Sequence, residues 1–389
     1  MNHARYASRA RWVTDTTVGN APPGMISFGS GDAYPEGLPD LGDLARVAAS
    51  SFRQETLQYS GRAGLPELRA WVARHVGEEG VRATPDDVVI VNGAKHALDL
   101  VCRLFVDPGD TVIVTTPAYM SALDIFRTYE VQFLEVTQDA EGMRVDDLRD
   151  RLRARRNAGS PLPKLLYDVP EFHNPSGVTL SAPRRGALAQ LAEEFGFLIV
   201  EDDPYRRIRF EGTAVPPIQS CAPPGVVVGI GTFSKLIAPG LRLGWVVATP
   251  DIAGRLGRLK SDGGSCPLTQ RLIIEYARAG HMEPHLRDLT RTYHAHRDIT
   301  MEALKRALPG ARWSRPQGGY YLWVHLPDGV DADRFAAAAW RHGAEVLPAS
   351  EFYATAGPAT HIRLAYSHAS PAEITEGVRR LGKALEEMR

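Results

Sequence analysis

Residues 229–244 read GIGTFSKLIAPGLRLG, a stretch that sets a lysine among hydroxyl residues and ahead of an arginine. Its first residues complete a predicted buried strand, after which come Thr232, Ser234 and Lys235, with Arg242 seven residues later. An amine at the tip of a strand suits imine formation with a phosphorylated aldehyde, because hydroxyls and a guanidinium can hold the phosphate while Lys235 acts as nucleophile. The alternative is a lysine that merely reaches solvent from a strand end. The sequence contains no complete dinucleotide-binding glycine motif and no Walker lysine motif.

Short apolar runs alternate with longer stretches of helical periodicity on both sides of this segment. Such alternation is typical of β-α units that build a largely parallel sheet with helices on both faces. The sequence therefore predicts an α/β domain. The predicted strands are 87–92, 111–115, 165–169, 197–202 and 226–231, and the predicted helices between them are 94–105, 118–129 and 183–195.

The pattern changes after about residue 285, where we expect a second, smaller α+β domain. It is predicted to hold a long helix over 283–308, strands over 319–325, 344–348 and 361–366, and a final helix from residue 371. Four prolines among the first 40 residues predict an extended arm. We therefore expect an N-terminal arm over residues 1–40, a large domain over 41–285 and a small domain over 286–389.

Charge and composition exclude several classes of protein. The 389 residues carry 45 basic and 46 acidic side chains, and a net charge of −1 gives no global field that would attract nucleic acid or a membrane. No stretch approaches the roughly 20 apolar residues that span a bilayer, and residues 1–24 lack the apolar segment of a secretory signal. Three scattered cysteines, Cys102, Cys221 and Cys266, fit a reducing compartment better than a disulfide framework. We expect a cytoplasmic protein.

No metal site is expected. His281 and His285 stand four residues apart, but Pro284 between them disfavours a regular helix, and the sequence has no paired-cysteine zinc pattern.

Two further strand ends supply groups that a pyridoxal phosphate ring requires. A carboxylate must keep the ring nitrogen protonated, and hydrogen-bond donors must stabilise the ring phenolate. Asp202, at the end of a predicted strand, fits the first role, and Tyr205 fits the second. Asn174, in the segment NPSG at 174–177, offers a second donor to the phenolate. The structural alternatives are a helix cap for Asp202 and a turn for Asn174.

The segment NGAKHAL at 92–98 passes from a predicted strand into a predicted helix. A helix N-terminus offers free backbone N–H groups and a favourable dipole end to a phosphate, so Ala94 and Lys95 are candidate phosphate-binding residues. Tyr119, in the segment PAY at 117–119, is a candidate for packing against the cofactor ring. A core tyrosine would give the same pattern.

Together these motifs resemble the fold-type I, pyridoxal-phosphate-dependent aminotransferases of class I/II, and most of all the subgroup of 2-aminoadipate and kynurenine aminotransferases. The resemblance extends from about Ile26 to the last predicted helix. It implies a large, mostly parallel seven-stranded sheet sandwiched by helices, a smaller α+β C-terminal domain, and pyridoxal 5'-phosphate as the cofactor. The motifs are QYSGRAG at 58–64, PAY at 117–119, NPSG at 174–177, EDDPY at 201–205, SK at 234–235, Arg242, and RLAY at 363–366.

The resemblance also implies a role for each matched residue. Arg363 would clamp the substrate α-carboxylate through a bidentate pair, with Gly31 approaching it by backbone and Asn174 beside it. A site completed from a neighbouring subunit implies a homodimer. The cofactor roles are the imine and proton transfer for Lys235, the ring nitrogen for Asp202, the phenolate oxygen for Asn174 and Tyr205, ring stacking for Tyr119, the phosphate for Ala94, Lys95, Thr232, Ser234 and Arg242, and the phosphate of the neighbouring subunit for Tyr59.

This chain departs from the subgroup near the expected phosphate. The subgroup tends to carry a serine and glutamines where this chain has Ala94, Lys95 and His96, which places two titratable groups near the phosphate or the ring face. Phe172 and His173 also replace more usual residues before the NPSG segment.

A second departure lies at the expected substrate entrance. Gly31 is followed by Asp32, then by Tyr34 and Glu36, where the subgroup favours an apolar residue. We hypothesise that Asp32 contributes to substrate binding and selects a polar substrate with a positive charge or hydroxyls, because a buried carboxylate needs a partner. The alternative is a solvated turn.

The expected reaction moves an amino group from an L-amino acid, polar or bearing a basic group, to a 2-oxo acid. The same kind of site can release a proton, a carboxyl group or a side-chain fragment from the α-carbon. A decarboxylase, lyase or oxidative deaminase of specialised metabolism is therefore the alternative, favoured by Lys95, His96 and Asp32. A ligand-sensing regulator is a third hypothesis, disfavoured because no basic helix-turn-helix segment is visible.

Overall fold

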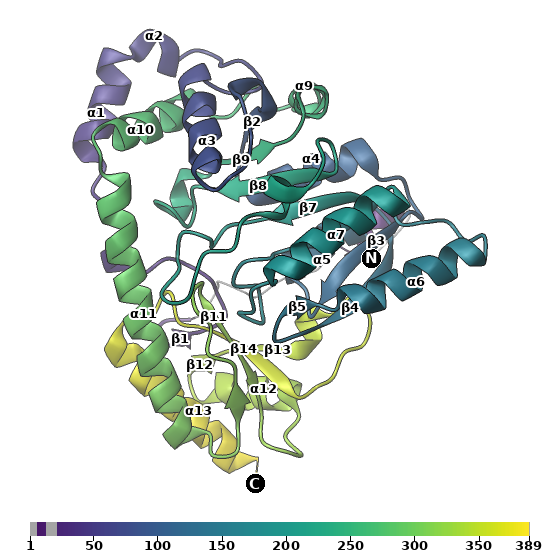
Figure 1. Cartoon of the computed structure of the whole chain (residues 1–389). Coiled ribbons are helices and arrows are strands. Elements are labelled where there is room, and N and C mark those ends of the chain that lie inside the picture. Colours follow the sequence, from purple (N-terminus) through teal and green to yellow (C-terminus); the bar gives the residue numbers. More distant parts are fainter. Residues whose placement is uncertain (1–5, 13–21, 389) are drawn as a thin grey trace.

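The computed structural model describes residues 6–12 and 22–388, and its centre is a twisted eight-stranded sheet (Figure 1). The strand order is β2-β9-β8-β7-β6-β3-β4-β5; neighbours from β8 to β4 are parallel, and β9 and β5 run antiparallel to their neighbours. The α/β class is thus confirmed. The strands are β2 (Val88–Val91), β3 (Thr111–Thr116), β4 (Gln132–Asp139), β5 (Gly142–Met143), β6 (Leu165–Asp168), β7 (Leu198–Asp202), β8 (Val227–Thr232) and β9 (Gly244–Val247).

The sheet has one strand more than the seven expected. The additional strand, β5, consists of two residues that turn back and pair with the end of β4. The five strands predicted for this part of the chain are all present, whereas β4 and β9 were not predicted. β4 carries polar and partly exposed residues, so it lacks the continuous apolar run that marks the other strands. β9 is a buried apolar run of four residues like β2, and the sequence analysis missed it.

Helices cover both faces of this sheet because alternate strand residues enter separate cores. Ile113, Leu166 and Ile199 pack with α6 and α7, whereas Val114 and Val200, from the same strands, belong to the core that includes α4 and α5. The helices of this part are α1 (Gly42–Ser51), α2 (Arg53–Thr56), α3 (Pro66–Glu78), α4 (Ala94–Phe105), α5 (Met120–Thr128), α6 (Val145–Asn157), α7 (Ala182–Phe195), α8 (Ile218–Cys221), α9 (Pro250–Leu259) and α10 (Pro267–Arg278).

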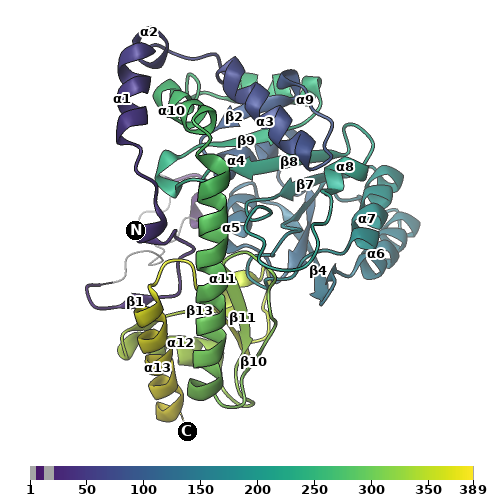
Figure 2. The same cartoon turned by 60° about the vertical axis from the view of Figure 1, so that its left-hand side comes forward.

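A smaller antiparallel sheet of order β10-β11-β14-β13 forms the C-terminal part, with α11, α12 and α13 packed around it (Figure 2). The long helix α11 runs from the large sheet down to this part (Figure 1). The strand expected over 344–348 is two short strands, β12 and β13, with different partners. The elements are α11 (Met282–Ala307), β10 (Arg312–Trp313), β11 (Tyr321–His325), α12 (Ala332–Arg341), β12 (Ala344–Glu345), β13 (Leu347–Pro348), β14 (His361–Ala365) and α13 (Pro371–Glu387).

The N-terminal segment is built into the C-terminal part. β1 (Ile26–Ser27) pairs in parallel with β12, Phe28 is fully buried, and the backbone N–H of Ala365 donates to the Phe28 carbonyl at 2.9 Å. Residues 1–5 and 13–21 of the expected arm, and residue 389, lie outside the described residues. The expected boundary between residues 285 and 286 falls inside α11, and the three-way division into arm, large domain and small domain stays a prediction.

Across residues 6–12 and 22–388, no helix combines the length and the apolar character that a membrane crossing requires.

Candidate functional site

A cavity of about 600 Å³ lies at the carboxyl ends of β6, β7 and β8, the position at which parallel sheets usually bind ligands. It is also bordered by the N-terminal segment and by the C-terminal sheet, through Gly31 and Arg363. The structure therefore brings together residues that lie more than 300 positions apart in the sequence. Thirteen of the predicted site residues line it: Gly31, Asp32, Ala94, Lys95, Tyr119, Asn174, Asp202, Tyr205, Thr232, Ser234, Lys235, Arg242 and Arg363.

Lys235 follows β8 in the tight turn that the TFSKL sequence forms. Its ammonium donates a hydrogen bond to the Gly31 carbonyl at 2.6 Å and lies 5.0 Å from the centre of the Tyr320 ring. Burial lowers the pKa of Lys235 to about 8; the charges of Arg363 and Arg242 add to this effect, and Asp32 opposes it. A lysine with this pKa is partly neutral near neutral pH, as a nucleophile or a general base must be.

Asp202 ends β7 and is 6% exposed. Tyr167, on the neighbouring strand β6, donates to Asp202 Oδ2 at 2.8 Å. Burial, reinforced by the charge of Asp203, raises the pKa of Asp202 to about 7, although the Tyr167 hydrogen bond opposes the shift. The other oxygen, Oδ1, is buried and has no hydrogen-bond partner within the described part of the chain. Buried acceptors are nearly always paired, so this oxygen is available to a donor in the cavity.

The hydroxyl residues and Arg242 converge on the first turn of α4. Thr232 Oγ1 lies 3.0 Å from Ser234 Oγ and accepts the Ser234 backbone N–H at 3.1 Å. A Cβ added to Gly93, the residue before α4, would lie 3.2 Å from Arg242 Nη2, so the absence of a side chain there lets the guanidinium approach the helix N-terminus. Free N–H groups, hydroxyls and a guanidinium together suit a phosphate.

Lys95 adds a second cation to this end of the cavity. It occupies the first turn of α4, and its pKa is lowered by burial and by the charge of Arg242. His96, the other departure in this segment, is not among the cavity-lining residues; its Nδ1 accepts the Asn92 backbone N–H at 3.1 Å. His96 therefore stabilises the strand-to-helix turn.

Arg363 is the buried cation at the opposite side of the cavity. It lies on β14, is 3% exposed, and donates to Asn174 Oδ1 at 3.0 Å and to the Gly29 carbonyl. Its Nε has no partner in the described ranges, and among these residues no carboxylate forms an ion pair with it. A buried guanidinium held only by neutral acceptors is suited to bind a carboxylate.

Tyr321 is a site residue that the sequence analysis missed. Its hydroxyl lies 3.2 Å from that of Tyr205, and the Arg363 guanidinium carbon lies 4.4 Å from its ring centre. A Cβ on Gly31 would overlap the Tyr321 hydroxyl, so glycine is required there. The Gly-Gly-Tyr-Tyr sequence at 318–321 was the available signal, but its partner Gly31 stands 290 residues away.

The remaining predicted residues lie at the margin of the cavity or outside it. The Asp32 carboxylate is exposed and accepts from Ser30 Oγ at 2.7 Å. Tyr59 is 85% exposed and is not among the residues that line the cavity. His173 is buried, and burial lowers its pKa to about 3, so it remains neutral. Within residues 6–12 and 22–388, no group of three or more histidine, cysteine or acidic side chains is arranged to hold a metal ion.

A lysine with a lowered pKa, a buried aspartate with a free oxygen, a helix start suited to a phosphate and a buried arginine share one cavity on an α/β sheet. These features define a pyridoxal-phosphate-dependent enzyme of fold type I. Residues 23–381 match the family described as aminotransferase class I and II, and the chain belongs to this family.

Curated relatives agree with this assignment. The chain is 35% identical over 374 residues to the 2-aminoadipate transaminase of Thermus thermophilus, covering 94% of this chain and 91% of the relative. It is 33% identical over 369 residues to the aromatic-amino-acid aminotransferase 1 of Thermococcus litoralis, covering 93% and 88%.

A solved structure gives the same result. The kynurenine aminotransferase of Pyrococcus horikoshii, solved in complex with PMP, matches with a TM-score of 0.92 and 32% identity over 99% of this chain and 97% of that one. The cofactor is pyridoxal 5'-phosphate, and the activity is transfer of an amino group between an amino acid and a 2-oxo acid.

Proposed function

We propose that the cavity binds pyridoxal phosphate with its ring nitrogen at Asp202, its aldehyde at Lys235, and its phosphate at Thr232, Ser234 and Arg242. The observation that carries this proposal is the free, buried Oδ1 of Asp202. A buried acceptor without a donor costs about 1–3 kcal/mol, and a protonated ring nitrogen supplies the missing donor. The backbone N–H groups of Ala94 and Lys95 complete the phosphate site.

The bound cofactor supplies an electron sink for the electrons released at the substrate α-carbon. Lys235, with its lowered pKa, removes the α-proton and returns it. The Gly31 carbonyl orients the amine through the 2.6 Å hydrogen bond. Arg363 holds the α-carboxylate through a bidentate pair, and Asn174 fixes the guanidinium from its other side.

Two tyrosines complete the proposed contacts to the cofactor. Tyr119 stacks on the ring, and Tyr205 donates to the phenolate oxygen together with Asn174. Support comes from their position: both tyrosines line the cavity, and burial raises the pKa of each hydroxyl, so both remain neutral donors.

The imine assignment is tested by the Lys235→Ala variant. It is expected to bind pyridoxal phosphate without the absorption band of the protein imine. Lys260→Met is the matched control, because Lys260 is also buried, with its pKa lowered to about 8, but lies outside the cavity; this variant should keep the band. An unchanged band in Lys235→Ala would refute the assignment.

The alternative reactions at the α-carbon are decarboxylation, side-chain cleavage by a lyase and oxidative deamination. Their products distinguish them from transamination. The reported relatives are named aminotransferases, which favours transamination. Incubation with an amino donor alone should give one equivalent of 2-oxo acid and pyridoxamine phosphate. Released carbon dioxide or ammonia, with pyridoxal phosphate retained, would favour the alternative.

We further propose that the amino donor carries a cationic side chain. Asp32 and Ser30 line both the main cavity and an adjoining one of about 260 Å³, which His368 and Glu373 also border. A side chain that extends past Asp32 would thus meet carboxylates, which favour an ammonium or a guanidinium.

The donor class is tested with Asp32→Asn against a panel of amino acids. We expect kcat/KM to fall about tenfold for lysine, ornithine and arginine, as for loss of roughly 1.4 kcal/mol, and to stay unchanged for leucine. Glu36→Gln, a nearby carboxylate outside the cavity, is the control. An unchanged ranking of donors would rule the proposal out.

A homodimer is proposed from the position of Tyr59. Its exposed ring, near the exposed side chain of Leu57, is available to reach the phosphate site of a second subunit. Tyr59→Phe should weaken cofactor binding without changing the dimer mass measured by light scattering. A monomeric wild type would contradict the proposal.

We also propose a cytoplasmic location, because three cysteines scattered along the sequence suit a reducing compartment better than a disulfide framework.

A further inference from the structure

Three carboxylates that are consecutive in the sequence line two different cavities. Asp202 lines the main cavity, whereas Glu201 and Asp203 line a small cavity of about 50 Å³. The alternation of side chains along β7 separates Glu201 from Asp202, and Asp203 follows the end of the strand. A charge at Asp203 therefore lies one residue from the proposed ring-nitrogen partner, but outside the site that cofactor and substrate occupy.

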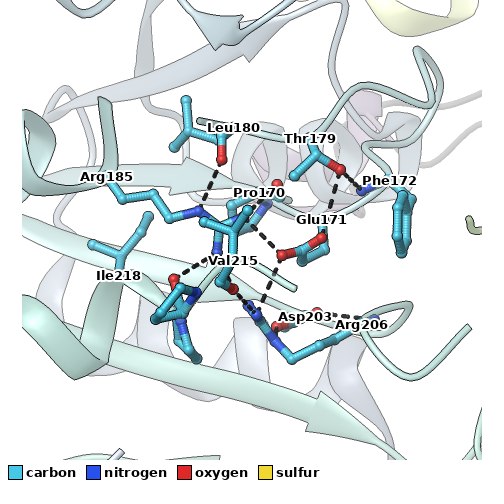
Figure 3. A network of polar contacts seen from close by, with 12 residues as sticks. Pro170, Glu171, Phe172, Thr179, Leu180, Arg185, Asp203, Arg206, Val215 and Ile218 are labelled. Atoms are coloured by element: carbon cyan, nitrogen blue, oxygen red, sulfur yellow. Dashed lines mark hydrogen bonds and ion pairs between the residues drawn. The ribbon is translucent and has the colours of Figure 1, made fainter. Parts of the chain in front are cut away.

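Arg206 is the cation that holds Asp203. Its Nε and its backbone N–H both donate to the Asp203 carboxylate, the second at 3.3 Å. Its Nη1 donates to Glu171 Oε1 at 3.2 Å and to the Val215 carbonyl, an arrangement that Figure 3 shows. The Arg206 side chain is only 8% exposed; its buried Nη2 makes no hydrogen bond in the described ranges and lies 3.9 Å from Glu201 Oε1.

Fixed groups surround this ion pair. Glu171 is fully buried and is held by Arg185 at 2.9 Å and by Arg206 at 3.2 Å (Figure 3). Arg209 holds the other oxygen of this carboxylate at 2.7 Å. Because the arginines are anchored through Glu171, Arg206 cannot leave Asp203 without breaking a buried network. The titratable and charged groups that face Asp202, Asp203 and Arg206 are Tyr119, Tyr167, Glu79, Glu171, Glu201, Arg185, Arg207, Arg209 and His75.

We propose that Asp203 and Arg206 are positioning residues that set the electrostatic potential at Asp202, and thereby how firmly the cofactor ring nitrogen holds its proton. The inference rests on the proposed binding of the ring nitrogen at Asp202. The Asp203 carboxylate makes Asp202 a stronger competitor for the proton that it shares with the ring nitrogen, and the Arg206 guanidinium limits that effect. The direction agrees with the raised pKa of Asp202, to which the Asp203 charge contributes after burial.

Substitution of Asp203 and substitution of Arg206 are expected to have opposite effects on the shared proton. Removing the anion with Asp203→Asn makes Asp202 less basic and should shift the shared proton toward the ring nitrogen. Removing the cation with Arg206→Met leaves Asp203 unscreened and should shift the proton toward Asp202. A merely structural role would weaken the site in both variants and would not give shifts of opposite sign. Arg206→Lys keeps the charge and should stay close to wild type.

The experiment is nitrogen NMR of the holoenzyme reconstituted with pyridoxal phosphate labelled at the ring nitrogen. The chemical shift reports the position of the proton, so it responds even where no full titration falls in the accessible pH range. We expect the Asp203→Asn resonance to move toward that of the protonated ring, because Asp202 becomes less basic. The Arg206→Met resonance is expected to move the other way.

Different results would overturn the role of Asp203 and the proposed binding of pyridoxal phosphate. An Asp203→Asn holoenzyme with the wild-type ring-nitrogen shift, or with a shift toward the unprotonated ring, would overturn this inference alone. If Arg206→Met does not fold, the Asp203→Asn result decides the matter, because this substitution keeps the size of the side chain and an oxygen that accepts the Arg206 hydrogen bonds. A wild-type protein that takes up no pyridoxal phosphate would overturn the proposed function and this inference with it.

Discussion

Substituting Gly31 by alanine should damage the site through Tyr321. The added methyl would overlap the Tyr321 hydroxyl, and the tyrosine is only 4% exposed, with the Arg363 guanidinium packed on its ring at 4.4 Å. Since neither partner has room to withdraw, overpacking of this kind costs about 1–3 kcal/mol. Gly31→Ala should also weaken the Lys235 hydrogen bond to the residue 31 carbonyl, and so cofactor binding.

A double-mutant cycle tests whether the hydroxyl is the cause. Tyr321→Phe alone loses the hydrogen bond to Tyr205, about 1 kcal/mol. In the double variant the nearest atom to the new methyl is the ring Cζ, at 3.0 Å, which small shifts can accommodate. The cycle should therefore show a coupling free energy of about 1–2 kcal/mol in urea unfolding of the cofactor-free protein. Costs that add within about 0.5 kcal/mol would refute this explanation of Gly31.

Two further predictions concern the charged residues. Arg363→Lys replaces a bidentate pair by a single contact, and a loss of about 3 kcal/mol of binding free energy should lower kcat/KM for the amino donor by about 100-fold. The exposed control Arg379→Lys should leave steady-state kinetics unchanged. Burial raises the pKa of Asp202 from 3.8 to about 7 in the folded protein. The protonated Asp202 carboxyl therefore stabilises the cofactor-free form fully below about pH 4, and this stabilisation is lost as the pH rises to about 7. Urea midpoints measured against pH should fall less steeply in Asp202→Asn, and parallel curves would contradict this.

Local signals in the sequence predicted the chemistry better than they predicted the supporting structure. Asp202 and Lys235 could be identified because each residue stands at the end of a continuous apolar run that predicts a strand. β4 could not, because its exposed positions carry polar residues that obscure the strand pattern. The expected burial of Asp32 was wrong, because its carboxylate is exposed and accepts from Ser30, and its contribution to substrate binding stays a prediction.

Long-range contacts explain most of what was missed. Tyr321 belongs to the site only because β11 brings it against Gly31, and nothing near either residue in the sequence indicates the pairing. The arginines around Glu171 were missed for a different reason. Arginine and glutamate are usually exposed, so a fully buried Arg185 and Glu171 run against the general expectation for these residue types.

The pairing of β1 with β12 gives the site a mechanical property. Because Phe28 is anchored beneath β14, only two residues separate this anchor from Gly31, whose carbonyl holds the lysine of the large sheet. Arg363 lies on the same β14. The groups at residues 31 and 363 should therefore travel as one unit whenever the C-terminal part shifts against the large sheet. A single-residue insertion between positions 28 and 31 would lengthen this link and uncouple lysine orientation from carboxylate capture.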